Sequence, residues 1–353
     1  MKTKKSRLLI ILFTVFFIVI YLFLAVKPIP DEYQFNPEWR ISVSSPLIQK
    51  DSDNKSIYFK LGQSIGYFDK NGKINNIVSY PSKSSISNSY YCTYNVDAHN
   101  TPFYKPDGSK AGIIHEYGFP FFNDDRIYVF LPGGTSLSKC NSEGENKWTY
   151  EGVIPITAFN SNLYSTIIGF ADGTINVINN ETGKTKTSYN PGGSDFPVVL
   201  GLDISNDNQY SASISGHNKQ RFVLFSDENN QQKIIFHTFL DSNVISRTFV
   251  QFTDDNKLVL YNYGNKLGIY DLVNKKNKSF DINTSIISMK ELENIIVLLG
   301  KKDDVYSIYF FEKSTILIGH FDFKADNAFI QTEDNMIFVG KDNSISKINV
   351  SRS

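Results

Sequence analysis

The sequence predicts an all-β fold, in which a four-stranded sheet is repeated around a closed ring. Three observations carry this prediction. The stretch from Leu163 to Tyr189 reads as β-branched and apolar strands separated by short turns. Its last turn, which contains Gly183, recurs at regular intervals along the chain. Inner runs such as Ile295 to Leu299 are apolar at successive positions, as expected for a sheet that is covered on both faces.

The recurring turn measures the length of the repeat. By subtraction of residue numbers, successive turns lie 36, 36 and 39 residues apart, and they contain Gly72, Gly108, Gly144 and Gly183. Similar turns without glycine follow near Asn230, Lys276 and Lys313. Units of about 40 residues with four strands each are typical of β-propeller blades. We therefore expect a single propeller; a pair of β-sandwiches with irregular loops is the alternative architecture.

The two ends of the chain are predicted to close the ring. Seven units are complete, and the last one, Phe329 to Val350, lacks its fourth strand. Phe35 to Ser42 precede the first complete unit and can supply that strand, which would remove two exposed sheet edges. This arrangement gives eight blades. Seven blades is the alternative, if the second unit with its Ser-rich lead-in, Pro81 to Tyr91, is not a blade.

An uncharged segment from Leu8 to Val26 precedes the repeats. As a helix it would be about 28 Å long, close to the roughly 30 Å hydrocarbon core of a bilayer. We expect a transmembrane helix whose membrane-facing residues include Leu8, Ile11, Phe13, Phe16, Phe17, Ile20, Leu24 and Val26. The predicted organisation is a cytoplasmic basic N-terminus at 1–7, the span at 8–26, a linker at 27–34 and the propeller at 35–353.

The charges around this segment predict its orientation. Four cations precede it, Lys2, Lys4, Lys5 and Arg7, and the positive-inside rule places them in the cytoplasm. A cleaved signal peptide would have an apolar region of roughly 7 to 15 residues and a small-residue cleavage site, for which Ala25 is a poor candidate. We expect an uncleaved anchor in the inner membrane, with a cleaved leader as the alternative. The propeller would then lie on the periplasmic, extracytoplasmic side.

Composition and side-chain spacing exclude several functions. Lys plus Arg and Asp plus Glu number 36 each, so no net charge favours nucleic acid as a partner. The histidines are isolated from one another, without metal-ligand spacing, and no Gly-x-Ser-x-Gly motif is present. Cys92 and Cys140 are interpreted as two buried free thiols, with a disulfide between neighbouring blades as the alternative. We predict no catalytic residue, no cofactor and no metal site.

The predicted first strand of each unit bears on whether the axis of the ring could hold a site. These strands are mainly apolar or aromatic, and they include Cys92 to Asn95, Phe119 to Asn123, Ile156 to Asn160 and Ile287 to Glu291. We therefore expect an axis that is plugged by side chains.

Two segments carry a resemblance to a known family. TSLSKCNSEGENKWTYEG (Thr135 to Gly152) and GTINVINNETGKTKTSY (Gly173 to Tyr189) are similar to repeats of the pyrroloquinoline-quinone-like β-propellers, which are also detected as WD40-like. Members that bind the quinone use adjacent cysteines, an active-site Asp and a calcium site, and this sequence has no such cluster. The resemblance implies a scaffold of the kind found in the outer-membrane protein assembly machine.

The sequence thus leads to a functional hypothesis. A membrane-anchored propeller would act as a protein-protein interaction scaffold in a bacterial cell envelope, with an envelope protein or peptide as its partner. The alternative is a propeller that uses its channel as an enzyme, or that binds a small ligand or polysaccharide.

Overall fold

The computed structural model describes residues 2–25, 32–44, 55–95, 99–228, 231–242 and 244–352; within the first range, side chains are described for residues 10–21. The chain forms two compact units. One comprises residues 1–36 together with 350–353, and the other comprises residues 37–349. Each unit is considered separately below.

The first unit contains helix α1 (Lys2–Ala25). The helix includes the basic residues before the predicted span, because Lys and Arg are good helix formers. Ten large apolar side chains between Ile10 and Tyr21 are 52 to 70% exposed, including Ile11, Phe13, Phe16 and Phe17. Among the described residues, no helix satisfies the length and hydropathy expected of a membrane span. Val26 and the side chains of Leu8, Leu24, Lys2, Lys4, Lys5 and Arg7 lie outside the described part.

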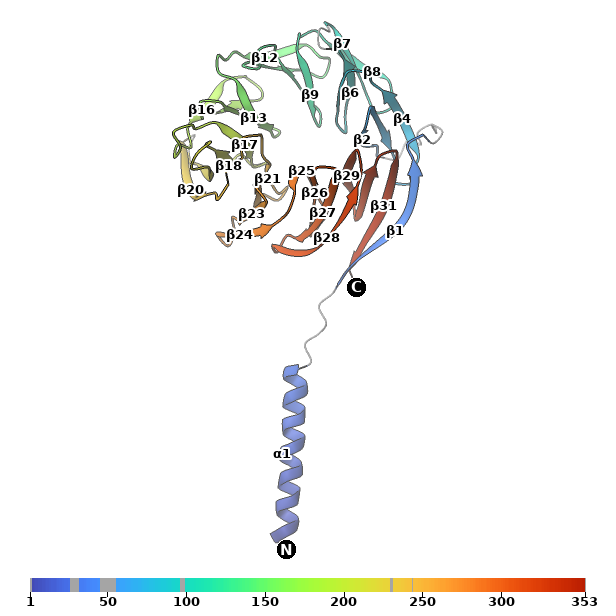
Figure 1. Cartoon of the computed structure of the whole chain (residues 1–353), viewed down its shortest axis with the longest axis vertical. Coiled ribbons are helices and arrows are strands. Elements are labelled where there is room, and N and C mark those ends of the chain that lie inside the picture. Colours follow the sequence, from blue (N-terminus) through green and yellow to red (C-terminus); the bar gives the residue numbers. More distant parts are fainter. Residues whose placement is uncertain are drawn as a thin grey trace. The chain divides into compact units, whose positions relative to one another are not determined.

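The second unit is built from antiparallel sheets that follow one another around a ring (Figure 1). Blades 1 to 4 consist of β2 (Ile57–Leu61), β3 (Ser64–Phe68) and β4 (Ile74–Ser79); β5 (Lys83–Ile86), β6 (Tyr91–Tyr94), β7 (Thr101–Tyr104) and β8 (Lys110–Ile114); β9 (Phe119–Asn123), β10 (Arg126–Phe130), β11 (Leu137–Cys140) and β12 (Asn146–Tyr150); and β13 (Ile156–Ser161), β14 (Ser165–Phe170), β15 (Ile175–Asn179) and β16 (Thr185–Tyr189).

Blades 5 to 8 complete the ring. They consist of β17 (Val199–Ile204), β18 (Tyr210–Ser215), β19 (Arg221–Glu228) and β20 (Gln231–Phe239); β21 (Val250–Phe252), β22 (Leu258–Tyr263), β23 (Lys266–Asp271) and β24 (Lys276–Asp281); β25 (Ser285–Glu291), β26 (Ile295–Lys302), β27 (Val305–Glu312) and β28 (Ile316–Lys324); and β29 (Ala328–Glu333), β30 (Met336–Lys341), β31 (Ser344–Arg352) and β1 (Tyr33–Ser42). The described residues therefore form an eight-bladed propeller, as predicted, and the seven-bladed alternative is wrong. Blade 1 has three described strands, and residues 45–54 before it are not described.

The predicted closure of the ring is confirmed. Strand β1 hydrogen-bonds β31 in blade 8, so the sheet order is β1-β31-β30-β29. An ion pair of 2.7 Å joins Glu38 to Lys347, and the Arg40 guanidinium donates to the Ser344 hydroxyl at 2.9 and 3.1 Å. The first strand of the chain, β1, is thus bound to the last one, β31.

One predicted first strand is wrong. Cys92 lies in β6, the second strand of blade 2, and the first strand is β5 from the Ser-rich lead-in. Strand β5 is short and polar, and it is held by a hydrogen bond in which the Phe122 N–H of blade 3 donates to the Ser85 hydroxyl at 3.0 Å. Hydrophobic patterning misses this strand because polar contacts between blades hold it.

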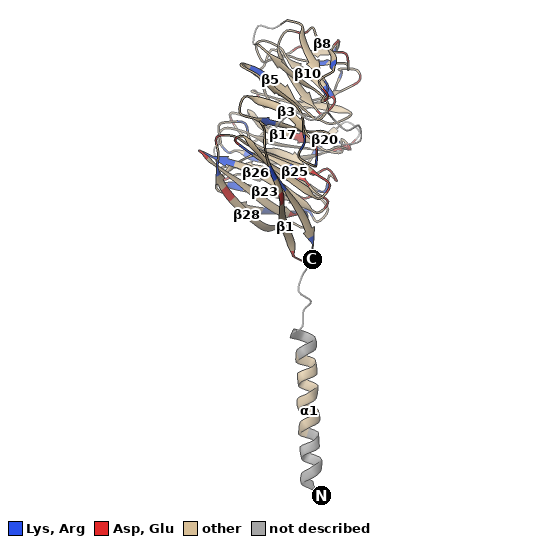
Figure 2. Cartoon of the chain, turned by 90° about the vertical axis from the view of Figure 1, so that its right-hand side faces the viewer, with Lys and Arg blue, Asp and Glu red and all other residues tan. Residues whose placement is uncertain are grey.

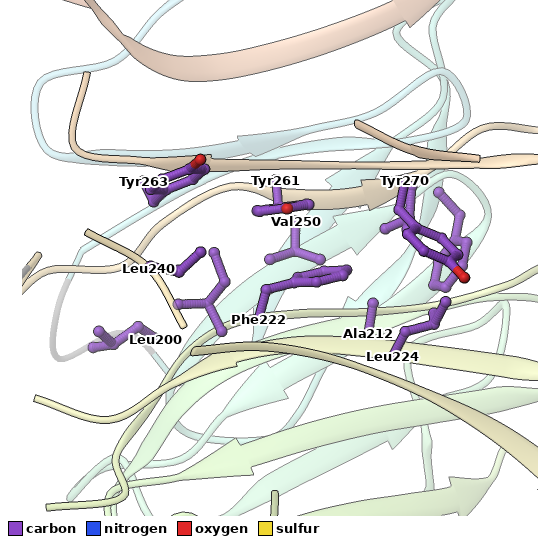
Figure 3. Close-up of a cluster of buried hydrophobic side chains, with 12 residues drawn as sticks. Leu200, Ala212, Phe222, Leu224, Leu240, Val250, Tyr261, Tyr263 and Tyr270 are labelled. Carbon is purple, nitrogen blue, oxygen red and sulfur yellow. The ribbon is translucent and has the colours of Figure 1, made fainter. Parts of the chain in front are cut away.

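The cores of the propeller lie between adjacent sheets. Between blades 5 and 6, the rings of Phe222 and Tyr261 stack with centroids 3.9 Å apart, and Leu200, Leu240 and Val250 lie in the same cluster (Figure 3). Each sheet is covered on both faces by its neighbours, which explains second strands that are apolar at successive positions, such as β26. Figure 2 shows cationic and anionic residues interspersed over the visible side of the sheets.

Candidate functional site

The topology gives the propeller two different faces. Because strands alternate in direction within each sheet, the first and third turns of each of the four-stranded blades 2 to 7 lie at one end, here called the turn face. The second turn and the connection to the next blade lie at the other end, here called the connection face. The first strand of each of blades 2 to 8 borders the axis, and cavities along this axis are the candidate site.

The half of the axis nearer the turn face contains a cavity of about 570 Å³. Its lining includes charged side chains from several blades, namely Lys55, Asp124, Asp254, Lys290, Glu291 and Glu333. Most of these charges are neutralised by near neighbours. Lys55 pairs with Glu333 at 2.8 Å, and Glu291 pairs with Lys313 at 2.8 Å. Burial raises the pKa of Glu291, and the hydrogen bond from Lys313 opposes that shift.

The half nearer the connection face contains an adjoining cavity of about 620 Å³. Its lining is largely apolar and aromatic, with Phe121, Phe159, Leu202, Phe249, Ile287 and Met289. Among the described residues of this lining, Arg247 and Lys290 are the cations and there is no Asp or Glu; Lys290 also lines the first cavity. The Arg247 guanidinium donates to the Phe159 carbonyl oxygen at 3.4 Å, and burial lowers its pKa.

The expectation of a plugged axis is therefore wrong. The first strands have alternating burial, as in β9, where Pro120 and Phe122 are buried whereas Phe119 and Phe121 are exposed. Because side chains alternate along a strand, about half of them face the axis rather than the neighbouring sheet. Phe121 lines both halves of the cavity without filling it. In β9 a Phe faces the axis at position 121 and a Phe faces the neighbouring sheet at position 122, so the apolar sequence alone does not tell which side chains point toward the axis.

Polar side chains join the first strands of neighbouring blades. In blade 5 the Asp203 carboxylate accepts hydrogen bonds from the Asn160 side-chain amide at 2.7 Å, the Ile204 N–H at 2.8 Å and the Phe252 N–H at 2.6 Å. These donors lie in blades 4, 5 and 6, so one carboxylate connects three blades. Burial raises the pKa of Asp203 to about 7, and the two backbone hydrogen bonds oppose this shift.

The connection face also displays apolar side chains. Val153, Phe196 and Ile245 are 92, 59 and 75% exposed, and they lie in the connections that enter blades 4, 5 and 6. Ile287, at the start of the first strand of blade 7, is 51% exposed and lines the adjacent half of the axial cavity. The turn face also carries exposed apolar side chains, among them Leu163 and Val273, but only the connection-face group adjoins the largely apolar half of the cavity, as is typical of interaction surfaces.

The described residues considered for redox or metal chemistry form neither a disulfide nor a ligand set, although Cys92 and Cys140 lie in the same buried cluster. Cys92 and Cys140 are buried free thiols, as interpreted from the sequence, and burial raises the pKa of each to about 12. The histidines lie apart, with His99 stacked on Tyr117 and His320 stacked on Tyr309. Within the described ranges, no three His, Cys, Asp or Glu side chains are placed to hold a metal ion.

Sequence reasoning missed the axial cations. Arg247 and Lys290 lie in different blades, 43 residues apart by subtraction, and no local motif marks either of them. The position of Arg247 in the connection that leads into the first strand β21 is the signal that could have identified it.

Comparisons with known proteins agree with this architecture. A protein of Treponema pallidum (strain Nichols), described as uncharacterized, is 25% identical over 362 residues, which covers 99% of this chain and 96% of that protein. The crystal structure of BamB from Moraxella catarrhalis matches 90% of this chain and 100% of its own, with a TM-score of 0.62 and 11% identity. The computationally designed Ika8 protein matches 85% of this chain and 94% of its own, with a TM-score of 0.64 and 15% identity.

At these low identities the two solved structures support the fold alone. Each of these structures is matched over nearly its whole chain, which agrees with a single closed ring of blades. A family model described as "beta-propeller protein" matches residues 1–352, and this chain therefore belongs to that family.

Proposed function

We propose that this protein is a membrane-anchored scaffold that lies outside the cytoplasm and binds an envelope protein or peptide on its connection face, without catalysing a reaction. The observation that carries the proposal is the group of exposed apolar side chains on successive blade connections, Val153, Phe196 and Ile245. A closed propeller fixes such side chains on a rigid frame, which lowers the entropic cost of binding.

The N-terminal helix supports the anchor. Its described side chains from Ile10 to Tyr21 are apolar apart from Thr14, and those on every side of the helix are exposed. A helix that is apolar all around is typical of a buried or membrane-embedded segment. Together with the uncharged sequence from Leu8 to Val26 and the cations before it, this supports insertion with the propeller on the extracytoplasmic side.

A second candidate function is binding of a small ligand in the axial cavity. The specific observation that favours it is the mixture of apolar walls with Arg247 and Lys290 in the half near the connection face. Cavities of roughly 300 to 1,000 Å³ with a few polar groups are typical of ligand sites.

Photo-cross-linking tests the proposed docking face. A benzophenone amino acid is placed at Ile245 in full-length protein, in living cells, and a matched probe is placed at Val273, which is 66% exposed in a turn on the opposite face. We expect one reproducible cross-linked product from position 245 and none from position 273. The product should disappear when Val153 and Phe196 are both changed to Asp, because two charges would disrupt an apolar interface.

The controls separate docking from other causes. Both probe-bearing proteins must accumulate to equal levels and retain the thermal midpoint of the unmodified chain. Cross-linking from Val273 but not from Ile245 would place the partner on the other face. A product that survives the Val153→Asp and Phe196→Asp changes would contradict the proposed surface.

A further inference from the structure

We propose that the half of the axial cavity near the connection face binds the carboxylates of an acidic, apolar peptide segment, with Arg247 and Lys290 as the anion-binding side chains. This inference rests on the proposed docking function and specifies the chemistry of the partner. The cavity adjoins the connection face, where Ile287 belongs both to its lining and to the exposed apolar surface.

The first argument is the lack of a counter-charge. Among the described residues, neither Arg247 nor Lys290 forms an ion pair. Arg247 has one hydrogen bond, to the Phe159 carbonyl oxygen, although a guanidinium carries five N–H donors. The Lys290 ammonium lies 5.6 Å from the centre of the Tyr58 ring. Both cations therefore retain donors for an incoming anion.

The second argument is the contrast with cations at the other end of the axis. There Lys55 pairs with Glu333, and Arg126 lies 3.8 Å from both Asp124 and Asp125. Lys290 lines both halves of the cavity, whereas Arg247 lines the connection-face half alone, and no described Asp or Glu lines that half. Carboxylates are the ligands whose geometry a guanidinium fork matches, so an acidic group is the complement that this half lacks.

The third argument is the nature of the walls. Phe249, Ile287 and Met289 line the same half as the two cations, and Met side chains adapt to ligands of different shape. A free inorganic anion would leave these apolar walls exposed to water. An acidic peptide with interspersed aromatic or aliphatic side chains would contact both the cations and the walls, and it could continue onto the exposed connections at Ile245.

Fluorescence anisotropy tests the proposal with a defined pair of peptides. The full-length protein in detergent is titrated into fluorescein-labelled Gly-Phe-Asp-Phe-Glu-Leu and into its amide analogue Gly-Phe-Asn-Phe-Gln-Leu, both with amidated C-termini. We expect the acidic peptide to bind at least about tenfold more tightly, because charged hydrogen bonds contribute enough free energy for that ratio. Equal binding of both peptides, or no saturable binding of the acidic one up to about 1 mM, would overturn the proposal.

Variants assign the effect to the two cations. Arg247→Gln and Lys290→Gln should each weaken binding of the acidic peptide by about tenfold and leave the amide peptide unchanged, and Arg247→Lys should retain part of the affinity. Lys301→Gln is the matched control, because the Lys301 ammonium also lies over a tyrosine ring, that of Tyr306 at 4.7 Å, without lining the cavity. Equal losses in Lys301→Gln and Lys290→Gln would exclude a specific site.

The test also distinguishes this inference from the proposed function. If position 245 still cross-links a partner in cells when Arg247→Gln is present, and the peptide pair shows no charge preference, docking stands and the carboxylate site does not. If peptide binding depends on Arg247 while position 245 yields no product, the cavity binds anions and the proposed docking face is wrong.

Discussion

Asp203 shows how one side chain contributes to a propeller. The innermost strand of a blade has a free edge along the axis, so backbone N–H groups there lack a partner strand. The Asp203 carboxylate accepts one such N–H, from Phe252 of the next blade, and also binds Asn160 of the preceding blade. Ser85 performs the same task for the Phe122 N–H. Burial of a carboxylate is costly, and the raised pKa of Asp203 reflects that cost.

The Asp203→Asn variant should change the pH dependence of stability. The folded-state pKa of Asp203 is about 7, above the ordinary 3.8, so the folded protein binds more protons than the unfolded chain between these values. Wild-type stability should therefore rise relative to Asp203→Asn as the pH falls from 8 to 4, by up to about 4 kcal/mol. Urea unfolding of both proteins across this range provides the measurement. A difference in unfolding free energy that does not vary with pH would show that Asp203 has an ordinary pKa.

At the scale of elements, three of the four recurring glycine turns, those of Gly72, Gly144 and Gly183, pack closely against the outer strand of the preceding blade. In blade 4, Gly183 has φ +68°, and a Cβ there would lie 2.6 Å from the Cβ of Trp148 in the outer strand of blade 3. Gly72 of blade 1 has φ +84° and approaches Trp39 of β1 in the same way, with a Cβ 3.3 Å from its ring. The strand that closes the ring, β1, therefore packs a tryptophan against the glycine turn of the next blade, as β12 does.

Removal of the Trp39 ring should weaken the closure. This side chain is partly buried against the blade 8 and blade 1 core, with its ring centroid 5.9 Å from that of Phe338. We expect Trp39→Ala to lower the free energy of unfolding by about 2 kcal/mol, less than the roughly 3 to 5 kcal/mol for truncation of a buried aromatic residue, because the ring is only partly buried. Trp39→Phe should lose less.

Chemical denaturation monitored by circular dichroism measures these differences. Tyr164→Ala, at a turn-face residue that is 56% exposed, serves as the control and should change stability by less than about 0.5 kcal/mol. If Trp39→Ala matched this control, β1 would not be needed to hold the ring closed.

The sequence predicted the strands and turns of the blades better than it predicted the cavity along the axis. The turn around Gly183 recurs because the glycines of these turns, Gly72, Gly108, Gly144 and Gly183, share a positive φ, and this requirement is local enough to be read from the sequence. Closure by Phe35 to Ser42 followed from counting strands. The polar strand β5 and the open axis could not be predicted in this way, because Ser85 and Arg247 take their roles from neighbouring blades that are distant in sequence.

For the whole molecule, the proposals join three properties. A ring closed by both ends of the chain provides rigidity, the connection face provides exposed apolar side chains, and the apolar N-terminal helix would hold the protein at a membrane. The central claim is that the connection face is presented outside the cytoplasm. Its test uses Val153, which is 92% exposed, together with the two native thiols, which are buried.

Labelling of Val153→Cys with a membrane-impermeant maleimide, in intact spheroplasts of cells that produce the full-length protein, tests this claim most directly. Because burial raises the pKa values of Cys92 and Cys140 to about 12, the wild-type protein should remain unlabelled near neutral pH. We predict rapid labelling of Val153→Cys before lysis, in a membrane fraction that resists alkaline extraction. Labelling that begins only after the spheroplasts are lysed would place the propeller in the cytoplasm and contradict the account.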